Sequence, residues 1–506
     1  MTQELIQELK AFVDRTTMYR LVLYYLLALF GAAVFFSIIG VLPYSSDALF
    51  WSAIVLLMWA WLTNEFFAWV FGAVTNSESV FITPLIILLI LPPVAFADAS
   101  GTIALAVIAA WAMASKYLLA IGKKHLFNPA ALAVALSAPL LGVSATWWVA
   151  GNIPLLPLVL IGGVMLVYKL RKTDLVLAFG ATVVVVTAFT SLHPISGVWN
   201  MFLHSSLLFF AFVMLTEPLT MPPTRMLRIV YAVMVGILFA PAAHLGSFYF
   251  SPELALVVGN LFAYFVSPKG RYMLSLIERR MLANGIYEYL FHSDRPLHFT
   301  PGQYIEWTLG GVPLDNRGNR RYFTLASAPE EPFVALGVRF YDQPSAFKRT
   351  LAELPVGGQI SVASLAGDFT MPKDVNKKLV FIAGGIGVTP FASMARHCIA
   401  AGKSHDAILL YSSKTASEIA YHEVFTDAAR VGWRTVYALS NEESFISGAY
   451  HGFIDAELVK REVPDYSERL FYISGPPGMV TAMKKMLLGI GVSRLNIKTD
   501  FFPGLA

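Results

Sequence analysis

Long apolar runs fill the first half of the chain and constrain its fold more than any other feature. About ten of them, separated by brief loops, are long enough to cross the roughly 30 Å hydrocarbon core of a bilayer. With 56% hydrophobic and 14% charged residues, the chain is too apolar for an ordinary soluble protein. We therefore predict a transmembrane electron-transfer domain over 1–270, a polytopic α-helical domain. Its expected spans lie near 21–42, 48–73, 79–97, 101–121, 128–147, 150–168, 174–191, 198–216, 227–247 and 251–267.

The loop charges predict the orientation of this domain. With ten spans, every Lys and Arg before residue 275 falls on one side of the membrane, and the loops on the opposite side have none. By the positive-inside rule the charged side is cytoplasmic. We expect a multi-pass protein of the cell (inner) membrane, with both termini in the cytoplasm. The charged residues are Lys10, Arg15, Arg20, Lys116, Lys123, Lys124, Lys169, Arg171, Lys172, Arg225, Arg228, Lys269 and Arg271.

Two counts narrow the chemistry further. The single cysteine, Cys398, excludes an intramolecular disulfide and an iron–sulfur cluster of the usual kind within this chain. The loop charges account for the formal net charge of +4, so we expect no nucleic-acid partner. The N-terminal residues 1–20 are polar and lack the pattern of a cleavable signal peptide.

From Arg271 onward the sequence is polar and of mixed charge, and short alternating segments follow one another. Alternation of apolar and polar residues predicts a small antiparallel β-barrel over 273–373. A buried strand running into a glycine turn and a helix predicts an α/β nucleotide-binding lobe over 376–506.

One strand of the predicted barrel, residues 319–329 (NRRYFTLASAP), resembles the flavin-binding strand of the ferredoxin-NADP reductase superfamily. Alternation places Arg321 and Phe323 on one strand face. The guanidinium can then meet the flavin pyrophosphate while the ring packs on the isoalloxazine. The resemblance also makes Tyr322 and Thr324 part of the FAD site, with Thr324 hydrogen-bonded to the flavin ring. The family usually has Tyr in place of Phe323, so the hydrogen bond from a phenolic hydroxyl to the ribityl chain is missing.

Three further segments match the same superfamily in the same order. Residues 299–304 (FTPGQY) resemble the strand before the flavin strand, and 367–372 (GDFTMP) resemble the segment that closes the barrel. Between them, Ser345 is expected to cap a helix that begins with Ala346 and Phe347. Free backbone amides at such a helix start can bind the flavin pyrophosphate.

The glycine turn at residues 384–390 (GGIGVTP) resembles the superfamily's nicotinamide-nucleotide turn. Glycines let the backbone approach a dinucleotide, and the following helix N-terminus attracts its phosphates. The residues that we assign to this turn are Gly384, Gly385, Gly387, Thr389 and Pro390.

Residues 474–479 (SGPPGM) resemble the superfamily's Cys-Gly-Pro-x-x-Met turn beside the nicotinamide. The resemblance assigns Gly475, Pro476 and Met479 to the nucleotide site. Ser474 stands in place of the usual cysteine, so the thiol that assists hydride positioning is absent.

Two other segments concern the nucleotide and the flavin. Ser413 and Lys414 either hold the 2′-phosphate of NADPH or form an ordinary solvated loop, so NADH and NADPH both stay open. At the C-terminus, Phe501 or Phe502 either shields the isoalloxazine until nicotinamide displaces it or belongs to a packed tail. The predicted catalytic residues are Thr324, Ser474 and Phe502.

Two loops of the membrane half, 122–131 (GKKHLFNPAA) and 215–224 (LTEPLTMPPT), resemble loops of another family. That family holds related membrane proteins of the Rnf electron-transport complex and of the sodium-translocating NADH:quinone oxidoreductase. The resemblance covers roughly residues 20–270, including 77–93 with Thr83, and implies FMN or riboflavin in this half. Asn128 and Thr216 either cradle that flavin or only cap helices.

The same family often carries FMN bonded to a threonine in a pattern ending Ser-Gly-Ala-Thr. This chain has VSAT at 143–146 and FGAT at 179–182, and neither preserves that pattern. Of the two, Thr146 is the better site for covalent FMN. The adjoining Trp147 and Trp148 also have a simpler interpretation, as an interfacial membrane anchor.

The sequence predicts a membrane-bound NAD(P)H dehydrogenase that passes electrons through FAD to a redox group, expected to be a flavin, in the membrane half. Quinone or an extracytoplasmic acceptor would receive them. One alternative is a redox-driven cation transporter, because Glu65 in the second span is an intramembrane carboxylate. Another is a haem-containing, ferric-reductase-like enzyme with His204 and His244 as haem ligands. We expect no other metal, and the sequence leaves the oligomeric state open.

Overall fold

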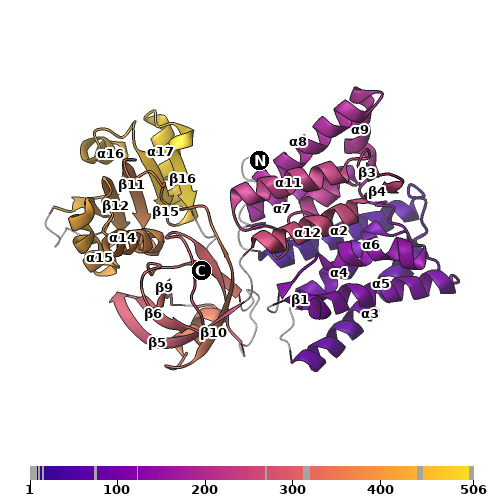
Figure 1. The fold of residues 1–506 in the computed structure, drawn as a ribbon, viewed down its shortest axis with the longest axis horizontal. Helices are drawn as coiled ribbons and strands as arrows, with labels where there is room; N and C mark the ends of the chain where they lie inside the picture. Colours follow the sequence, from indigo (N-terminus) through magenta and orange to yellow (C-terminus); the bar gives the residue numbers. More distant parts are fainter. Residues whose placement is uncertain are drawn as a thin grey trace. The chain divides into compact units, whose positions relative to one another are not determined.

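The computed structural model describes residues 8, 12–13, 16–72, 77–121, 124–267, 271–310, 320–342, 344–441 and 448–500. The chain divides into two compact units, Met1–Gly270 and Arg271–Ala506 (Figure 1). The first unit is helical, and the second contains two six-stranded sheets.

Helices make up almost all of the first unit. A helical segment overlaps each of the ten ranges that the apolar runs predict. Two short antiparallel hairpins accompany the helices: β1 (Ala120–Ile121) with β2 (Lys124–His125), and β3 (His244–Leu245) with β4 (Phe248–Tyr249). The helical segments are α2 (Met18–Ile38), α3 (Ser46–Phe71), α4 (Ser77–Ile90), α5 (Ala99–Leu118), α6 (Pro129–Leu141), α7 (Leu156–Leu170), α8 (Thr173–Thr190), α9 (Pro194–His204), α10 (Leu207–Phe209), the π-helical η1 (Phe210–Met214), α11 (Arg225–Phe239) and α12 (Pro252–Val266).

Only some of these helices are long enough to cross a bilayer. Within the described residues, α2, α3, α5 and α8 have the length and apolar composition of a span. Counting α9 and Leu207–Met214, which meet at a 64° bend, as one span gives a fifth. The 13 residues of α6 cover about 20 Å at 1.5 Å per residue, less than the roughly 30 Å core. By length and composition, four or five of the described helices therefore qualify as spans, compared with the ten that the sequence predicts.

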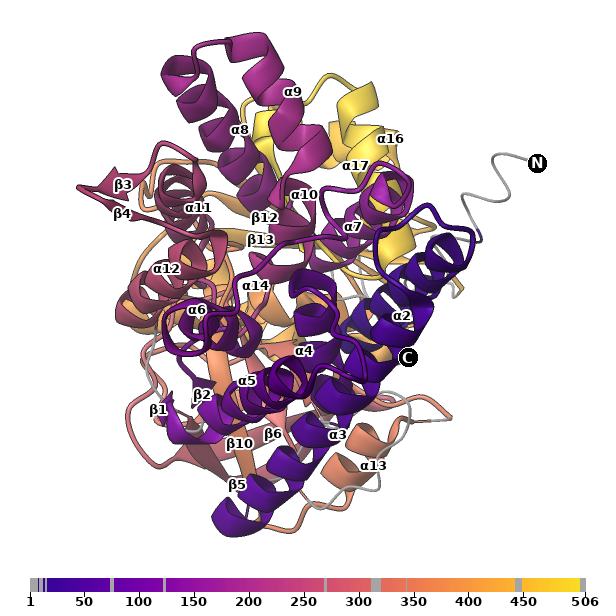
Figure 2. The same ribbon diagram turned by 90° about the vertical axis from the view of Figure 1, so that its right-hand side faces the viewer.

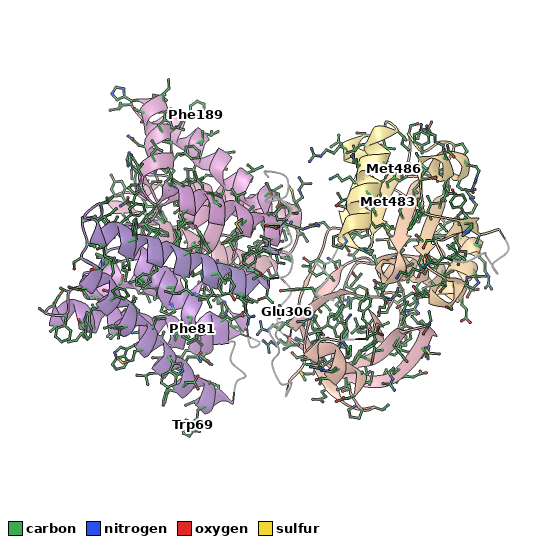
Figure 3. The ribbon with its side chains drawn as sticks, turned by 180° about the vertical axis from the view of Figure 1, so that it is seen from behind. Trp69, Phe81, Phe189, Glu306, Met483 and Met486 are labelled. Carbon is green, nitrogen blue, oxygen red and sulfur yellow. The ribbon has the colours of Figure 1, made fainter. Side chains whose placement is uncertain are left out.

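The helices of the first unit lie in two groups around a shared centre. Helix α3 packs along α4 and α5 toward one end of the unit, and α8 packs along α9 and α11 toward the other (Figures 1 and 2). The short helices α6 and α12 pack against each other between these groups. Many large apolar side chains face outward, among them Trp69 and Phe189, which project from the unit in Figure 3. Such a surface is typical of contact with lipid or another protein.

The second unit begins with the predicted antiparallel β-barrel. Its sheet has the order β8-β7-β10-β5-β6-β9, and the amide of Ala326, just after β8, donates to the carbonyl of Ala335 in β9 at 2.9 Å. Trp307, Phe291 and Phe347 are fully buried in its core. Its elements are β5 (Tyr272–Ala283), β6 (Ile286–Ser293), β7 (Tyr304–Thr308), β8 (Arg320–Thr324), β9 (Val334–Arg339), α13 (Ala346–Ala352) and β10 (Gln359–Ala366).

A parallel α/β lobe follows the barrel, as predicted. The sheet order is β14-β13-β12-β11-β15-β16, and all its pairs are parallel. Cys398, in α14, is buried in the core on one face of this sheet. The elements are β11 (Leu379–Gly384), η2 (Gly385–Val388), α14 (Thr389–Ala401), β12 (Ala407–Ser413), η3 (Ala416–Glu418), α15 (His422–Ala428), η4 (Ala429–Val431), β13 (Trp433–Leu439), β14 (Tyr450–His451), α16 (Ala456–Glu462), β15 (Leu470–Ser474), α17 (Pro477–Gly489), η5 (Arg494–Asn496) and β16 (Ile497–Asp500).

Candidate functional site

The predicted flavin strand is β8, an edge strand of the barrel sheet. Phe323 packs against Phe347 of α13 with ring centroids 5.8 Å apart, and the Arg321 guanidinium lies 5.6 Å from the same ring. Arg321 and Phe323 therefore share a face, as strand alternation predicts. The buried hydroxyl of Thr324 has no hydrogen-bond partner among the described residues. The structure thus places a cation and an aromatic ring on one face of the strand, and the Thr324 hydroxyl follows one residue further along on the alternate face.

Tyr322 alternates to the other face of β8. Its hydroxyl donates to Glu306 in β7 at 2.6 Å, and Arg320 lies 3.5 Å from the same carboxylate. The predicted cofactor residue Tyr322 thus lies on the opposite strand face from Arg321 and Phe323. Figure 3 marks Glu306, a buried carboxylate that the sequence did not single out.

Ser345 caps α13, as predicted. Its hydroxyl accepts the backbone amide of Lys348 at 3.4 Å, and Ala346 and Phe347 are buried at the start of the helix. The helix has only seven residues. In this structure, α13 presents the Phe347 ring to both Arg321 and Phe323.

The glycine turn follows β11, and strands β12 and β15 lie on either side of β11. The chain proceeds from β11 to β12 on one side and returns to β15 on the other, so the turn lies at the topological switch point, where open α/β sheets bind ligands. Gly385 has a φ of +52°, a conformation that favours glycine. A Cβ added at Gly387 would lie 2.6 Å from the Gly475 Cα, so only glycine fits there.

The Ser474 turn meets this glycine turn directly. Ser474 is buried at the end of β15 and pairs in register with Ala383. The Met479 sulfur and the Pro476 ring are the nearest atoms to a Cβ added at Gly384. The structure therefore places both predicted nucleotide motifs at one edge of the sheet. Thr389 and Pro390 begin α14 immediately behind them, and the Thr389 hydroxyl donates to the Ile386 carbonyl at 3.2 Å.

Ser413 ends β12 at the same sheet edge. Its hydroxyl is buried and has no partner among the described residues, whereas Lys414 is exposed. These positions leave the prediction of NADH or NADPH open. Phe501 and Phe502 lie outside the described residues. Asp500 ends β16 and pairs in register with Ser474.

The sequence interpretation missed Arg339, the last residue of β9. Its Nη1 atom lies 3.6 Å from the position of a Cβ at Gly385, and its Nη2 atom lies 2.9 Å from Glu418. A guanidinium from the barrel thus faces the predicted dinucleotide turn. The sequence feature that could have identified Arg339 is a basic residue at the end of a predicted strand.

In the first unit, Asn128 caps α6, the structural alternative that the sequence left open. Its side chain accepts the Ala131 amide at 3.0 Å, and its own amide donates to Asn260 of α12 at 2.8 Å. Thr216 does not cap a helix start; its hydroxyl donates to the Phe212 carbonyl at 2.7 Å. Close by in sequence, Glu217 contacts His125 at 3.2 Å, so the two predicted loops are joined.

The residues around Thr146 close the end of the short helix α4. The amides of Thr146 and Trp147 donate to the Ile90 carbonyl, and the Trp148 indole donates to Leu91 at 2.9 Å. These donors satisfy carbonyls that a helix end leaves open. The Trp147 indole donates to the buried carboxylate of Glu253 at 2.6 Å.

Both tryptophans are buried, so the interpretation as an interfacial anchor is wrong. Their indole donors find carbonyl and carboxylate partners inside the bundle. The Thr146 side chain remains exposed.

The residues behind the two alternatives are exposed on the first unit. Glu65 faces outward on α3 and accepts the Asn64 amide at 3.4 Å. His204 ends α9, and His244 lies in the β3–β4 hairpin, where its ring contacts the Gly246 carbonyl at 3.0 Å. Among the described residues, no group of three or more His, Cys, Asp or Glu side chains could hold a metal ion.

Comparison with known proteins supports the interpretation of the second unit. Residues 381–485 match the family of oxidoreductase NAD-binding domains. The second unit carries a ferredoxin-reductase-like FAD/NAD-binding module. It is an NAD(P)H-dependent flavin oxidoreductase module.

Two curated relatives illustrate the likeness. The glycine betaine monooxygenase reductase subunit of Pseudomonas aeruginosa (strain UCBPP-PA14) is 26% identical over 245 residues, which cover 46% of this chain and 64% of the relative. The flavohemoprotein of Oceanobacillus iheyensis is 26% identical over 217 residues, covering 41% and 52%. The chain thus spans between about half and two thirds of these relatives. Among solved structures, the Amycolatopsis cytochrome P450 reductase GcoB is 25% identical with a TM-score of 0.41, covering 46% of this chain and 71% of that one.

Proposed function

We propose that the chain is a membrane-bound NAD(P)H dehydrogenase. It passes electrons from NAD(P)H through FAD to a flavin held by the first unit, and on to quinone or an extracytoplasmic acceptor. One observation carries this proposal: a single chain joins a flavin oxidoreductase module to helices that are long and apolar enough to cross a membrane.

The residues of the second unit fit the two cofactors. Arg321 supplies a cation for the FAD pyrophosphate, Phe323 a packing surface, and Thr324 an unpartnered hydroxyl for the flavin ring. The glycine turn and the Ser474 turn receive the nicotinamide nucleotide at the sheet edge. Bound FAD supplies the ability to take up a hydride and release electrons singly, and the protein supplies orientation.

Features of the first unit support a second redox group there. Its loops resemble those of the family of membrane proteins shared by the Rnf complex and the sodium-translocating NADH:quinone oxidoreductase, which implies FMN or riboflavin. The contacts of Asn128 with Asn260 and of His125 with Glu217 hold these loops on the bundle. The exposed Thr146 is the proposed site of covalent attachment. The one-sided loop charges support cytoplasmic termini and a place in the cell membrane.

The test uses the full chain purified in detergent. We expect oxidation of NADH or NADPH with a soluble quinone as acceptor. After acid precipitation, FAD should appear in the supernatant, and a second flavin either there or on the polypeptide. A colourless protein that oxidises neither nucleotide, even with an artificial dye, would refute the proposal.

A matched pair of variants tests the attachment site. Thr146→Ala should abolish any flavin fluorescence of the denatured polypeptide. Thr182→Ala, in the FGAT sequence at 179–182, should leave that fluorescence unchanged. The Thr182 hydroxyl donates to the Ala178 carbonyl at 2.8 Å within its own helix, and the Thr146 hydroxyl donates to the Ile90 carbonyl at 3.3 Å. Equal labelling of wild type and Thr146→Ala would exclude Thr146.

A further inference from the structure

One face of α14 joins the two lobes of the second unit. The helix begins at Thr389, immediately after the glycine turn. Ser393, Arg396 and His397 follow at helical spacing and lie on the same face as Thr389. All three make side-chain contacts with the barrel or with the segment that leaves it.

The first contacts reach the chain just beyond the flavin strand. The Ser393 hydroxyl donates to the Ser327 carbonyl at 2.6 Å, and Arg396 Nη1 donates to the Ala326 carbonyl at 3.1 Å. The Ala326 and Ser327 carbonyls are two and three residues beyond Thr324, the last residue of the flavin strand. His397 extends the contact to Glu330 at 2.8 Å. The helix that follows the nucleotide turn therefore holds the exit of the flavin strand.

Arg396 also forms a buried ion pair with the barrel. Its Nη1 and Nη2 atoms lie 2.9 and 3.3 Å from the two carboxylate oxygens of Glu288 in β6, a bidentate arrangement. Only 15% of the arginine side chain and 2% of the glutamate side chain are exposed. Glu331 lies 4.0 Å from the same guanidinium. Buried pairs of this kind rarely add stability over apolar residues, but they fix geometry.

Tyr421 completes the contact between the lobes. Its ring lies 5.3 Å from the Arg396 guanidinium, and its backbone has a φ of +61°, rare for a bulky residue. A Cβ added at Gly337 of β9 would lie 2.5 Å from the Tyr421 hydroxyl and 2.8 Å from Thr389 Cγ2. Burial raises the pKa of Tyr421 well above its ordinary value, so the hydroxyl keeps its proton. Strand β9 therefore packs directly against Tyr421 and Thr389 of the lobe, with no room for a side chain at Gly337.

We propose that Arg396 is a positioning residue for hydride transfer. By binding Glu288 and the Ala326 carbonyl at once, it fixes the distance between the flavin strand and the nicotinamide turn. This inference rests on the proposed reaction and adds a determinant of its rate. Spacing matters because a misplacement of about 1 Å can lower a rate roughly a hundredfold.

The test compares single-turnover flavin reduction in full-length, FAD-loaded protein. Glu288→Leu/Arg396→Met removes both charges of the buried pair, while Glu331, whose side chain is 24% exposed, keeps its hydrogen bond from the Ala328 amide. We expect the reduction rate at saturating nucleotide to fall about tenfold or more. The apparent nucleotide Kd and the bound FAD should change little. The charge-transfer absorbance between reduced nicotinamide and flavin should weaken.

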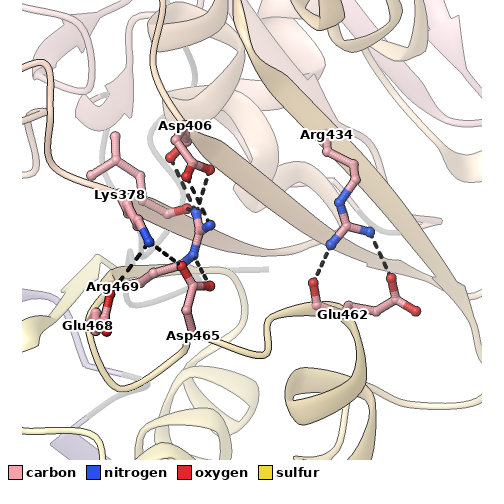
Figure 4. Close-up of polar contacts among 8 residues, drawn as sticks. Lys378, Asp406, Arg434, Glu462, Asp465, Glu468 and Arg469 are labelled. Carbon is pink, nitrogen blue, oxygen red and sulfur yellow. Dashed lines mark hydrogen bonds and ion pairs between the residues drawn. The ribbon is translucent and has the colours of Figure 1, made fainter.

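Arg469→Met is the matched control. Arg469, whose side chain is 7% exposed, binds Asp406 and Asp465, all within the nucleotide lobe, as Figure 4 shows. This variant should lose thermal stability but reduce flavin at the wild-type rate while folded. Arg396→Lys, which keeps the charge, should recover part of the rate that the double variant loses.

Three outcomes would overturn the inference: an unchanged reduction rate in the double variant, the loss of its FAD, or an equal slowing in Arg469→Met. Failure of the proposed function is distinguishable from these results. In that case wild-type protein itself would not be reduced by either nucleotide.

Discussion

The two units differ in where their largest apolar side chains lie. In the first unit, large apolar side chains such as Trp69 and Phe189 are 81% and 87% exposed on the helices. In the second unit, Trp307, Phe291 and Phe381 are fully buried, and the ion pair of Arg396 with Glu288 joins a helix to a strand. Both units have an apolar core, so the difference lies in what covers it. The first unit exposes an apolar surface that is typical of contact with lipid or another protein, whereas the second keeps these large aromatic side chains in its core.

The largest expected effect concerns solubility. A fragment comprising residues 271–506 should stay in the supernatant after ultracentrifugation without detergent, bind FAD and oxidise NAD(P)H with an artificial dye. The full chain should sediment with membranes unless detergent is added. Full-length protein that stayed in the aqueous supernatant would break the comparison.

A second prediction concerns the glycine turn of the second unit. Gly387→Ala should lower the rate of flavin reduction by NAD(P)H at least about tenfold, because the new methyl group would collide with the Gly475 backbone. Stopped-flow absorbance of the flavin measures this rate. Gly478→Ala is the control, since a Cβ there has no atom within 4 Å. Equal rates in both variants would show that the turn tolerates the added volume.

A third prediction concerns a buried hydrogen bond of the first unit. Trp147→Phe keeps an aromatic ring but removes the indole donor to Glu253, leaving a buried carboxylate without that partner. We expect a loss of about 1–3 kcal/mol in unfolding free energy. Thermal unfolding in detergent, followed by circular dichroism, reports the change. Trp199→Phe, at an exposed position, should have no comparable effect.

The smallest effect concerns Asp465 in the second unit. Hydrogen bonds from Arg469, followed by those from Lys378, lower the pKa of this carboxyl from 3.8 to about 2. A lowered pKa means that the stabilisation is present above pH 3.8 and is lost as the pH falls toward 2. Because the side chain is 28% exposed, we expect about 1 kcal/mol after solvent screening.

The measurement for Asp465 compares urea unfolding of the 271–506 fragment with that of Asp465→Asn. The stability difference should be full at pH 6 and small at pH 2.5. A difference that did not depend on pH would show that the carboxylate charge is not what stabilises this contact.

Local pattern predicted much of the second unit. Strand alternation was enough to place Arg321 and Phe323 on one face, and the glycine turn lies between a buried strand and a helix, as predicted. The pair Glu288–Arg396 was not predictable, because its partners are 108 residues apart and only the folded barrel brings them together. Arg339 was missed for the same reason.

In the first unit, the apolar runs predicted helices but not their lengths. Helix α4 ends at Ile90 inside its apolar run, because Pro92 and Pro93 cannot continue it, and residues 146–148 supply donors for its last carbonyls. The composition around Trp147 resembled an interfacial segment, and nothing local revealed its partner Glu253 on α12. Helix type and some helix ends depend on nearby sequence, whereas the groups that satisfy other helix ends are distant in the chain.

The burial of Cys398 has a practical consequence for labelling. It is the single thiol of the chain, and burial raises its pKa to about 11, so almost none of it is thiolate at neutral pH. Maleimide dyes and thiol-specific nitroxide probes should therefore not react with the native protein. A cysteine engineered at any surface position will then carry the only reporter, with no background to subtract.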